Sequence, residues 1–303
     1  MCGLSSRLRL VFNIPLLFFT FRLFAFSAEG ISGLLRLADS LAGNGLRSEA
    51  AVEYRRAICF SSDSNILCPA YYGLGLQYRD LGEFEKAGKS FISAADYAPG
   101  DSLRDEIKLT LASVLISAGN TNIAMMTLFP LSKSSNFRQI RLESTLLLFI
   151  CAVRQHNWED ARNYFSEYLK MDPDPSGCDS SASLIIGILS QAESTSGYSP
   201  GKSKLLSVFL PGLGQVYSGD LRGGINSLVL NSFNFWVVGL NIVRADYIGA
   251  ILYFLFVTER YYSGNLYRAE EAAVKANIDI DERFEKQITG KFRRLFVPAE
   301  IKK

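Results

Sequence analysis

The chain has 303 residues, of which 48% are hydrophobic and 12% aromatic, enough for roughly two domains of about 150 residues each. Its 32 basic and 30 acidic residues leave a formal charge of +2, and no block of lysine and arginine stands out. Nucleic-acid-binding proteins neutralise phosphates with such blocks, so this balance argues against a nucleic-acid partner.

Residues 1–28 have the pattern of an export signal. Arg7 and Arg9 precede an apolar run, and the small residues around Ser27 offer a cleavage site after residue 27 or 28. Arg22, near the end of the apolar run, departs from the pattern and favours the alternative of an uncleaved membrane anchor. The signal predicts an exported protein, periplasmic in a bacterium.

A repeat organises residues 31–175. An alanine recurs every 37 residues, a large side chain follows each alanine by four positions, and a turn residue precedes it by five. The i, i+4 spacing marks one helical face, so four helical hairpins are predicted. The alanines are Ala50, Ala87, Ala124 and Ala161, the large residues Tyr54, Phe91, Leu128 and Phe165, and the turn residues Gly45, Gly82, Gly119 and His156.

The second unit closely resembles a tetratricopeptide repeat. The signature residues are Leu74, Gly75, Tyr78, Gly82, Phe84, Ala87, Phe91, Ala94 and Pro99. The other units keep the pattern more loosely, and the fourth has Phe149 where the family has a helix-contact glycine. The resemblance implies an all-α fold, a tetratricopeptide-like helical-hairpin solenoid.

The 37-residue unit exceeds the family's 34-residue repeat by about one helical turn. Ser102 and Ser135 offer N-caps, which places the extra turn at the start of each first helix.

The resemblance also implies a concave groove for a protein or peptide partner, because hairpins that cannot bury their apolar faces alone stack into a superhelix. Its lining, from the outer face of each first helix, would be Leu35, Asp39, Tyr72, Leu76, Arg79, Leu109, Ser113, Ile116, Leu146, Ile150 and Arg154. The alternative is that parts of the chain itself, such as residues 179–196, cover this mostly apolar face.

The repeats end at Pro173, Pro175 and Gly177, which break helices. Residues 179–200 are predicted to form a capping helix and a linker. Five cysteines without a CxxC pair or a histidine-rich neighbourhood argue against a metal site, and helical burial is favoured over a structural disulfide.

Residues 203–268 read as a membrane domain. A run over residues 224–243 is long enough to cross a hydrocarbon core of about 30 Å, and a shorter apolar run covers residues 247–257. Ser227, Asn231, Asn234 and Asn241 draw a polar stripe along the longer run, and amides are costly in lipid, so the stripe should face protein.

The start of this domain resembles small bacterial membrane domains that begin with a P-G-x-G-Q-x-Y motif. The residues that match are Pro211, Gly212, Gly214, Gln215, Tyr217 and Gly219. The resemblance implies contact with membrane lipid and little about chemistry. Pro211 and the glycines should break a helix after Leu210, and Gln215 and Tyr217 are expected to satisfy the freed backbone groups.

Residues 269–303 are predicted to form a charged amphipathic tail whose basic end, Arg293 and Arg294, lies near anionic headgroups. Three membrane crossings would put the C-terminus in the cytoplasm, and this arrangement is slightly favoured by the basic tail. A re-entrant first element would leave both ends outside.

No catalytic or cofactor-binding constellation is found. "GKS" at residues 201–203 lacks the preceding glycine of a phosphate loop, and His156 has no nucleophile or metal-ligand partner in sequence reach. The sequence therefore predicts a non-enzymatic, membrane-tethered protein-binding scaffold without cofactor. The alternative is a small membrane protein that assists transport or insertion through its polar-striped helices.

Overall fold

The computed structural model describes residues 28–171 and 179–296, all helical apart from short connections. The predicted export signal, the helix breakers at 173–177 and the side chains of Arg293 and Arg294 lie outside this description. The chain divides into two compact units, Met1–Leu147 and Leu148–Lys303, with the division inside helix α7.

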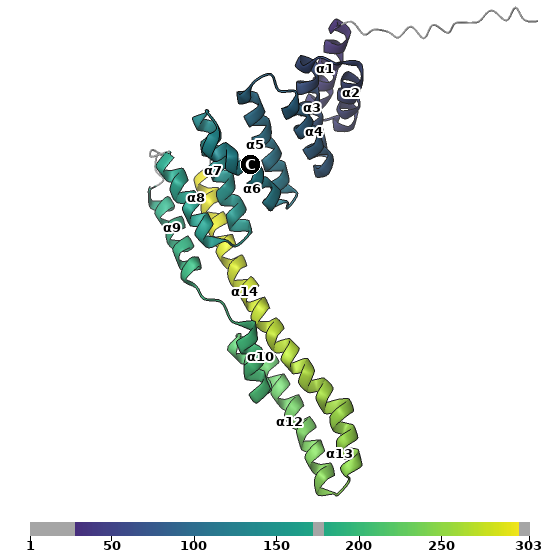
Figure 1. The fold of residues 1–303 in the computed structure, drawn as a ribbon, viewed down its shortest axis with the longest axis vertical. Helices are drawn as coiled ribbons and strands as arrows, with labels where there is room; N and C mark the ends of the chain where they lie inside the picture. The colour runs from purple at the N-terminus through teal and green to yellow at the C-terminus, as the bar shows by residue number, and fades with distance from the viewer. Residues whose placement is uncertain (1–27, 172–178, 297–303) are drawn as a thin grey trace, which may run out of the picture. The chain divides into compact units, whose positions relative to one another are not determined.

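Consecutive helix pairs form the repeat region (Figure 1). The first helices are α1 (Ala28–Gly43), α3 (Ser64–Asp80), α5 (Asp101–Ser117) and α7 (Arg138–Arg154), and the second helices are α2 (Arg47–Phe60), α4 (Phe84–Asp96), α6 (Thr121–Ser134) and α8 (Trp158–Met171). The second helices begin at residues 47, 84, 121 and 158, so the predicted 37-residue register holds in each unit.

Each hairpin turns through one residue with a left-handed backbone. Gly45, Gly82 and Gly119 have φ of 78°, 77° and 80°, and His156 has φ of 56° at the matching place in the last unit. Glycine adopts this conformation without a Cβ clash, whereas a histidine there is strained. The turn positions expected from the sequence are confirmed.

The hairpin cores rest on the periodic residues. All four repeat alanines are fully buried, and the large residues that follow them are at most 4% exposed. Two aromatic rings lie close to the backbone of α3 at its glycines. A Cβ at Gly73 would lie 2.4 Å from the Tyr54 ring, and a Cβ at Gly75 would lie 2.9 Å from the Phe91 ring. The small residues therefore set the spacing between neighbouring helices.

The extra turn lies in the first helices, but the predicted N-caps are wrong. α3, α5 and α7 have 17 residues, whereas the second helices have 13 or 14. Ser102 lies inside α5, whose N-cap is Gly100. Ser135 stands three residues before α7 and donates to the Asp105 carboxylate at 2.7 Å. Its Oγ also accepts from the Phe137 amide at 3.3 Å, one residue before the helix begins.

In the compact unit Leu148–Lys303, α9 (Asp179–Ser194) packs against α8 and against α14 (Glu259–Phe296), a helix of 38 residues. Phe149, which replaces the family's glycine, packs on Phe165 at 4.9 Å and on Phe292 of α14 at 5.6 Å between ring centroids. Ile288 of α14 is 1% exposed. The C-terminal half of α14 is therefore part of the core around the fourth hairpin.

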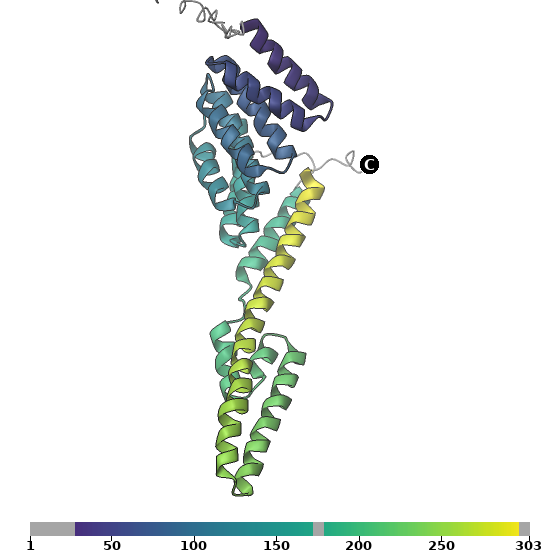
Figure 2. The ribbon, with the colours of Figure 1, turned by 90° about the vertical axis from the view of Figure 1, so that its right-hand side faces the viewer.

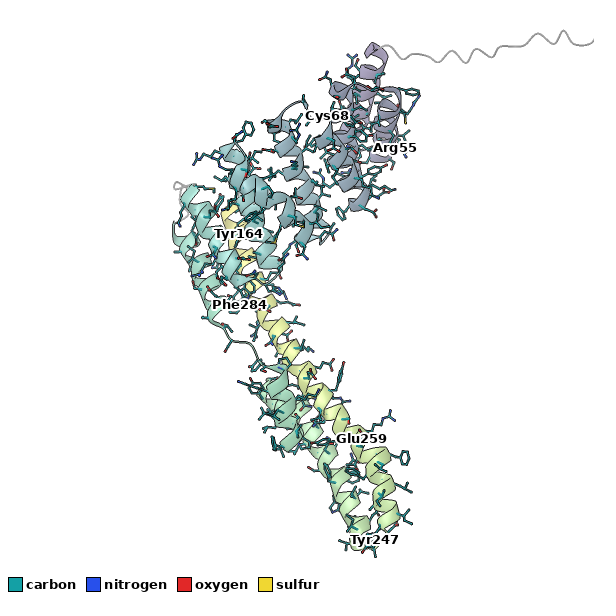
Figure 3. The ribbon with its side chains drawn as sticks, viewed as in Figure 1. Arg55, Cys68, Tyr164, Tyr247, Glu259 and Phe284 are labelled. Atoms are coloured by element: carbon teal, nitrogen blue, oxygen red, sulfur yellow. The ribbon has the colours of Figure 1, made fainter. Side chains whose placement is uncertain are left out.

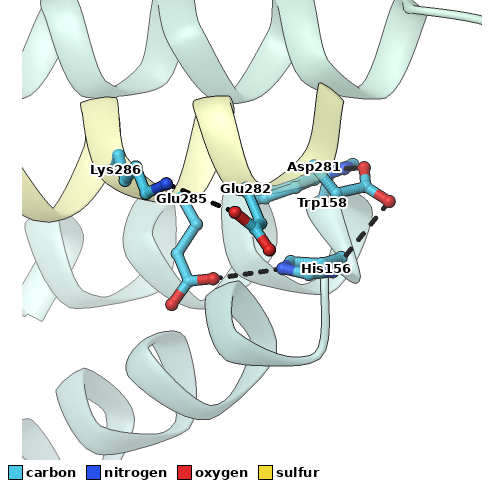
Figure 4. Close-up of polar contacts among 6 residues, drawn as sticks. All are labelled: His156, Trp158, Asp281, Glu282, Glu285 and Lys286. Atoms are coloured by element: carbon cyan, nitrogen blue, oxygen red, sulfur yellow. Dashed lines mark hydrogen bonds and ion pairs between the residues drawn. The ribbon is translucent and has the colours of Figure 1, made fainter. Parts of the chain in front are cut away.

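Polar contacts fasten α14 to the turn between α7 and α8 (Figure 4). His156 Nε2 lies 3.1 Å from a carboxylate oxygen of Glu285, and Trp158 Nε1 donates to Asp281 at 3.2 Å. The Trp158 ring also contacts the Phe284 ring at 6.0 Å. This stretch of the predicted charged tail therefore binds the fourth hairpin.

The apolar C-terminal region forms a helical module. It comprises α10 (Pro200–Phe209), α11 (Leu213–Tyr217), α12 (Leu221–Val243), α13 (Tyr247–Tyr253), a π-helical turn η1 (Phe254–Thr258) and the first half of α14. α12 and the continuous helix α13–η1–α14 run side by side (Figure 2). Tyr247 marks the tip of this pair, and Glu259 lies farther along α14 (Figure 3).

Among the described residues, α12 is the helix long and apolar enough to cross a membrane, by length and composition alone. The run at 247–257 and the charged tail belong to one unbroken helix, so the expected boundary at residue 268 falls inside α14. Cys59, Cys68 and Cys151 are free thiols, and burial raises the pKa of the Cys151 thiol to about 11.

Candidate functional site

The residues predicted to line a groove lie on the first helices, with Leu35 and Asp39 on α1, Tyr72, Leu76 and Arg79 on α3, Leu109, Ser113 and Ile116 on α5, and Leu146, Ile150 and Arg154 on α7. Of these, Asp39, Arg79 and Arg154 are exposed. The chain divides within α7, so Ile150 and Arg154 belong to the compact unit Leu148–Lys303, and the other predicted groove residues, including Leu146 at the boundary, belong to the compact unit Met1–Leu147.

Several of these side chains already serve the hairpin cores. Ile116 is only 6% exposed. Tyr72 and Leu76 pack on the cluster around Phe91, and the Tyr72 and Phe91 rings meet edge to face at 5.5 Å. Asp39 accepts a hydrogen bond from Tyr54 at 2.5 Å. This face therefore offers less free apolar surface than the sequence pattern indicates.

A cavity lies on a different face of the compact unit Met1–Leu147. It has a volume of about 640 Å³ and is lined by residues of α4, α5 and α6, none of which belongs to the predicted groove. Ile92, Ile123 and Met126 line it and are 52%, 54% and 77% exposed. Glu85, Lys89, Asp96 and Lys108 add charges of both signs to its lining. We name it the α4–α6 cavity.

The P-G-x-G-Q-x-Y motif forms a sharp turn between α10 and α11. Gly212 has a left-handed backbone with φ of 93°, and a Cβ there would lie 2.1 Å from the Gly224 carbonyl oxygen. The Gly212 amide donates to Asn265 Oδ1 at 3.0 Å, and the Gly214 amide donates to Ser207 Oγ at 3.0 Å. The freed backbone groups are thus satisfied by Asn265 and Ser207, and the expectation that Gln215 and Tyr217 would do so is wrong.

Gln215 has a different task. Its side chain is 1% exposed, and Nε2 donates to Ser227 Oγ of α12 at 2.9 Å and approaches Asn265 Oδ1 of α14 at 3.3 Å. Asn265 Nδ2 in turn donates to the Ser207 carbonyl oxygen of α10 at 3.3 Å. One buried amide therefore joins α11 to the two long helices.

The remaining motif residues shape the turn. Pro211 is half-buried at its start, and Gly219 has φ of 89° after α11. Tyr217 is half-exposed, and its ring meets the Tyr198 ring edge to face at 5.4 Å. A Cβ on Gly214 would lie 1.9 Å from the Ser203 carbonyl oxygen, so α10 and α11 cross here at backbone contact.

Three of the four residues in the polar stripe of α12 point into the protein, and Asn241 is half-buried. Ser227, Asn231 and Asn234 are at most 4% exposed. Asn231 Nδ2 donates to the Ser227 carbonyl oxygen at 2.8 Å, and Asn234 Oδ1 accepts from Tyr253 Oη at 2.9 Å. The stripe therefore holds α12 against the neighbouring helix.

Three members of this polar core were not among the predicted site residues: Ser203, Ser207 and Asn265, each at most 2% exposed. Ser203 and Ser207 are four residues apart on α10, and that spacing on an apolar helix is the signal that could have revealed them. Asn265 gave no local signal, because its role depends on where α14 packs.

Within the described ranges no three His, Cys, Asp or Glu side chains gather to hold a metal ion. A scan against protein-family models finds no match, and a search of curated proteins finds no similar sequence.

Proposed function

We propose that this protein is a membrane-anchored scaffold, in which the paired helices α12 and α13–α14 lie in the bilayer and the helical repeat binds a protein partner. The main support for this proposal is the distribution of polar and apolar side chains in the C-terminal helical module, which is the reverse of that in a water-soluble protein. In this module many uncharged polar residues are inside and many large apolar residues are outside, whereas the charged Glu259 and Arg260 are exposed.

The inversion is extensive. Ser203, Ser207, Gln215, Ser227, Asn231 and Asn265 are at most 4% exposed. The large exposed apolar residues of the pair include Val229, Phe233, Trp236, Ile248, Leu255 and Phe256, all more than half exposed. Water would oppose this arrangement because contiguous apolar patches are costly to hydrate, whereas lipid favours it. We name α12 with residues 247–268 the anchor pair.

The lengths fit a bilayer. α12 has 23 residues and would extend about 35 Å, against a hydrocarbon core of about 30 Å. The tip between α12 and α13 carries Arg244 and Asp246, and the opposite end carries Asp220, Arg222 and Arg268. Charges at both ends suit two crossings, with both helix bases on one side.

The contacts of α14 support a topology in which the repeat and the C-terminal end of the chain lie on the same side of the bilayer. Asp281 and Glu285 of α14 contact Trp158 and His156 of the fourth hairpin. Because these groups touch, the C-terminal half of α14 and this hairpin lie on the same side of the bilayer. This argues against the favoured three-crossing arrangement with a cytoplasmic C-terminus and for the alternative in which both ends lie outside.

We infer that the partner, a protein or peptide, contacts the α4–α6 cavity. Its exposed Ile92, Ile123 and Met126 offer apolar surface, and the mixed charges around them suit a polar rim, as in other protein interfaces. The resemblance to tetratricopeptide repeats supports partner binding as such, although the family uses the first-helix face.

The anchor is tested by charging its outward face. Val229→Asp with Phe233→Asp should remove the full-length protein from the membrane, because an aspartate at the bilayer centre costs about 2.5–3.5 kcal/mol. The fraction that stays in the membrane pellet after an alkaline carbonate wash measures this. Val274→Asp with Ile278→Asp is the matched control, since both residues are exposed on α14 beyond the anchor pair. Wild-type protein that washes off would refute the anchor.

Partner binding is tested by a photo-crosslinking residue placed at one position at a time in the native membrane. Position 126 in the α4–α6 cavity should give one discrete protein adduct. Position 52 on α2, where Val52 is 42% exposed, should give none. An adduct at Arg79 alone would return the site to the first-helix face, and the absence of an adduct at both 79 and 126 would contradict the scaffold.

A further inference from the structure

A second cavity lies within the anchor pair. It has a volume of about 490 Å³ and is lined by residues of α12, η1 and α14. The lining includes Arg260 and Arg268 and no acidic residue. Both arginines are exposed, and no other described side chain forms an ion pair or hydrogen bond with either of them. The cavity therefore has positive charge that the surrounding protein does not neutralise.

An unsatisfied acceptor belongs to one of the residues that line this cavity. Asn231 is 2% exposed and lines it, and its Nδ2 donates to the Ser227 carbonyl oxygen. Its Oδ1 is buried and has no hydrogen-bond partner. A buried carbonyl oxygen without a donor is rare in proteins and indicates that something else supplies the donor. A hydroxyl group of a ligand would do so.

The two arginines line the same cavity from one helix. They stand at i and i+8 on α14, about 12 Å apart along the axis, with Gly264 midway. A Cβ at Gly264 would meet no atom within 4 Å, so the space between the arginines is open. Each guanidinium can reach inward along the helix, and arginine binds phosphate oxygens through paired hydrogen bonds.

The cavity changes character along its length. Toward the tip of the anchor pair its lining is Leu230, Phe256 and Val257, and toward the base it is Gly264 and Arg268. Asn231 lies one helical turn closer to the tip than Ser227, which shares Gln215 with Asn265. From base to tip, the lining therefore runs from Arg268 through Arg260 and Asn231, which stand at about the same level, to an apolar end.

That order matches a lipid with one acyl chain. We propose that the cavity binds an anionic lysophospholipid, with its phosphate between Arg260 and Arg268, its free glycerol hydroxyl donating to Asn231 Oδ1, and its acyl chain along Leu230 and Phe256. In a lipid with two acyl chains, the second chain esterifies this hydroxyl of the acylated glycerol. The assignment rests on the proposed insertion of the anchor pair, which puts Arg268 at the headgroup level and Arg260 about 12 Å deeper.

The η1 turn helps to build this site. Ala250 and Thr258 are both buried and stand eight residues apart, one more than the seven that return an α-helix to the same face. The wider π turn absorbs the extra residue, and such turns are frequent at functional sites.

The test uses the detergent-purified full chain and native mass spectrometry of bound lipid. Three probes carry the same glycerol phosphate with one, two or no acyl chains: 1-oleoyl-glycerol 3-phosphate, its dioleoyl counterpart, and free glycerol 3-phosphate. The single-chain lipid should bind about tenfold more tightly than the dioleoyl lipid. Free glycerol 3-phosphate should not compete at equal concentration. Equal binding of all three probes would overturn the assignment.

Variants divide the site into its parts. Arg260→Gln with Arg268→Gln should weaken single-chain binding about tenfold, as expected for lost charge-assisted hydrogen bonds. Gly264→Leu, which fills the cavity without changing charge, should do the same. Asn231→Leu should abolish the preference over the dioleoyl lipid. Arg222→Gln, a charge change at the base outside the cavity, should leave binding unchanged, and an equal loss there would reduce the effect to general surface charge.

The anchor and the lipid site fail separately. Wild-type protein that stays in the membrane pellet but shows no preference for the single-chain lipid overturns the lipid site alone. Wild-type protein that leaves the pellet overturns the anchor, and with it the reason for a lipid at this cavity.

Discussion

Replacing Gly214 with alanine should cost the full-length protein about 3 kcal/mol of stability, at the upper end of what overpacking usually costs. The added Cβ would lie 1.9 Å from the Ser203 carbonyl oxygen and 2.6 Å from Ser207 Oγ. Backbone atoms cannot rotate away as a flexible side chain can, so α10 and α11 must separate. The separation would also break the Gly214 amide bond to Ser207.

This loss is measured as the temperature at which half of the detergent-solubilised protein ceases to be monodisperse. A drop of about 5 °C is expected for that change in a chain of 303 residues. Gly201→Ala on the same α10 is the matched control, because a Cβ at Gly201 meets no atom within 4 Å. The control should hold or slightly raise the midpoint, since alanine favours a helix over glycine. An unchanged midpoint for Gly214→Ala would show that the close crossing is absent.

Replacing Asn265 with leucine should have a similarly large effect through lost hydrogen bonds. The Asn265 side chain accepts from the Gly212 amide, contacts Gln215 Nε2 and donates to the Ser207 carbonyl oxygen. Leucine fills nearly the same volume but leaves these groups without partners in a buried site. Each unsatisfied group costs about 1–3 kcal/mol, so a loss of about 3 kcal/mol or more is expected.

Asn226→Leu makes the same chemical change on the exposed face of α12 and serves as the control. It should leave the thermal midpoint unchanged, because Asn226 makes no contact that leucine removes. Equal losses in both variants would indicate a general effect of asparagine on these helices, and a silent Asn265→Leu would contradict the buried network.

The repeat region followed closely from local pattern. The spacing of Ala50 and its counterparts fixed the register, and Gly45, Gly82 and Gly119 predicted the turns, because glycine adopts a left-handed backbone more readily than other residues. Helix N-caps were less predictable. Ser102 lies inside its helix, and Ser135 bonds to Asp105 from the neighbouring first helix, a contact that sequence spacing does not reveal.

The candidate sites were harder to predict. Ile116 and Tyr72 match the groove positions of the resembled family, yet their side chains are taken up in the hairpin cores. The α4–α6 cavity depends on how far α4 and α6 stand apart over α5, and no local pattern encodes that distance. Charge pattern likewise predicted a charged amphipathic tail but not its contacts, in which Asp281 and Glu285 face Trp158 and His156.

By itself the sequence determined the helical hairpins, their 37-residue period and the apolar and polar sides of α12, because each depends on residues within a turn or two of one another. Only the tertiary structure decided that Asn265 completes the turn at Gly212 and that α14 returns to the fourth hairpin. These contacts join residues 53 and 129 positions apart, and such pairings follow from the packing of whole helices.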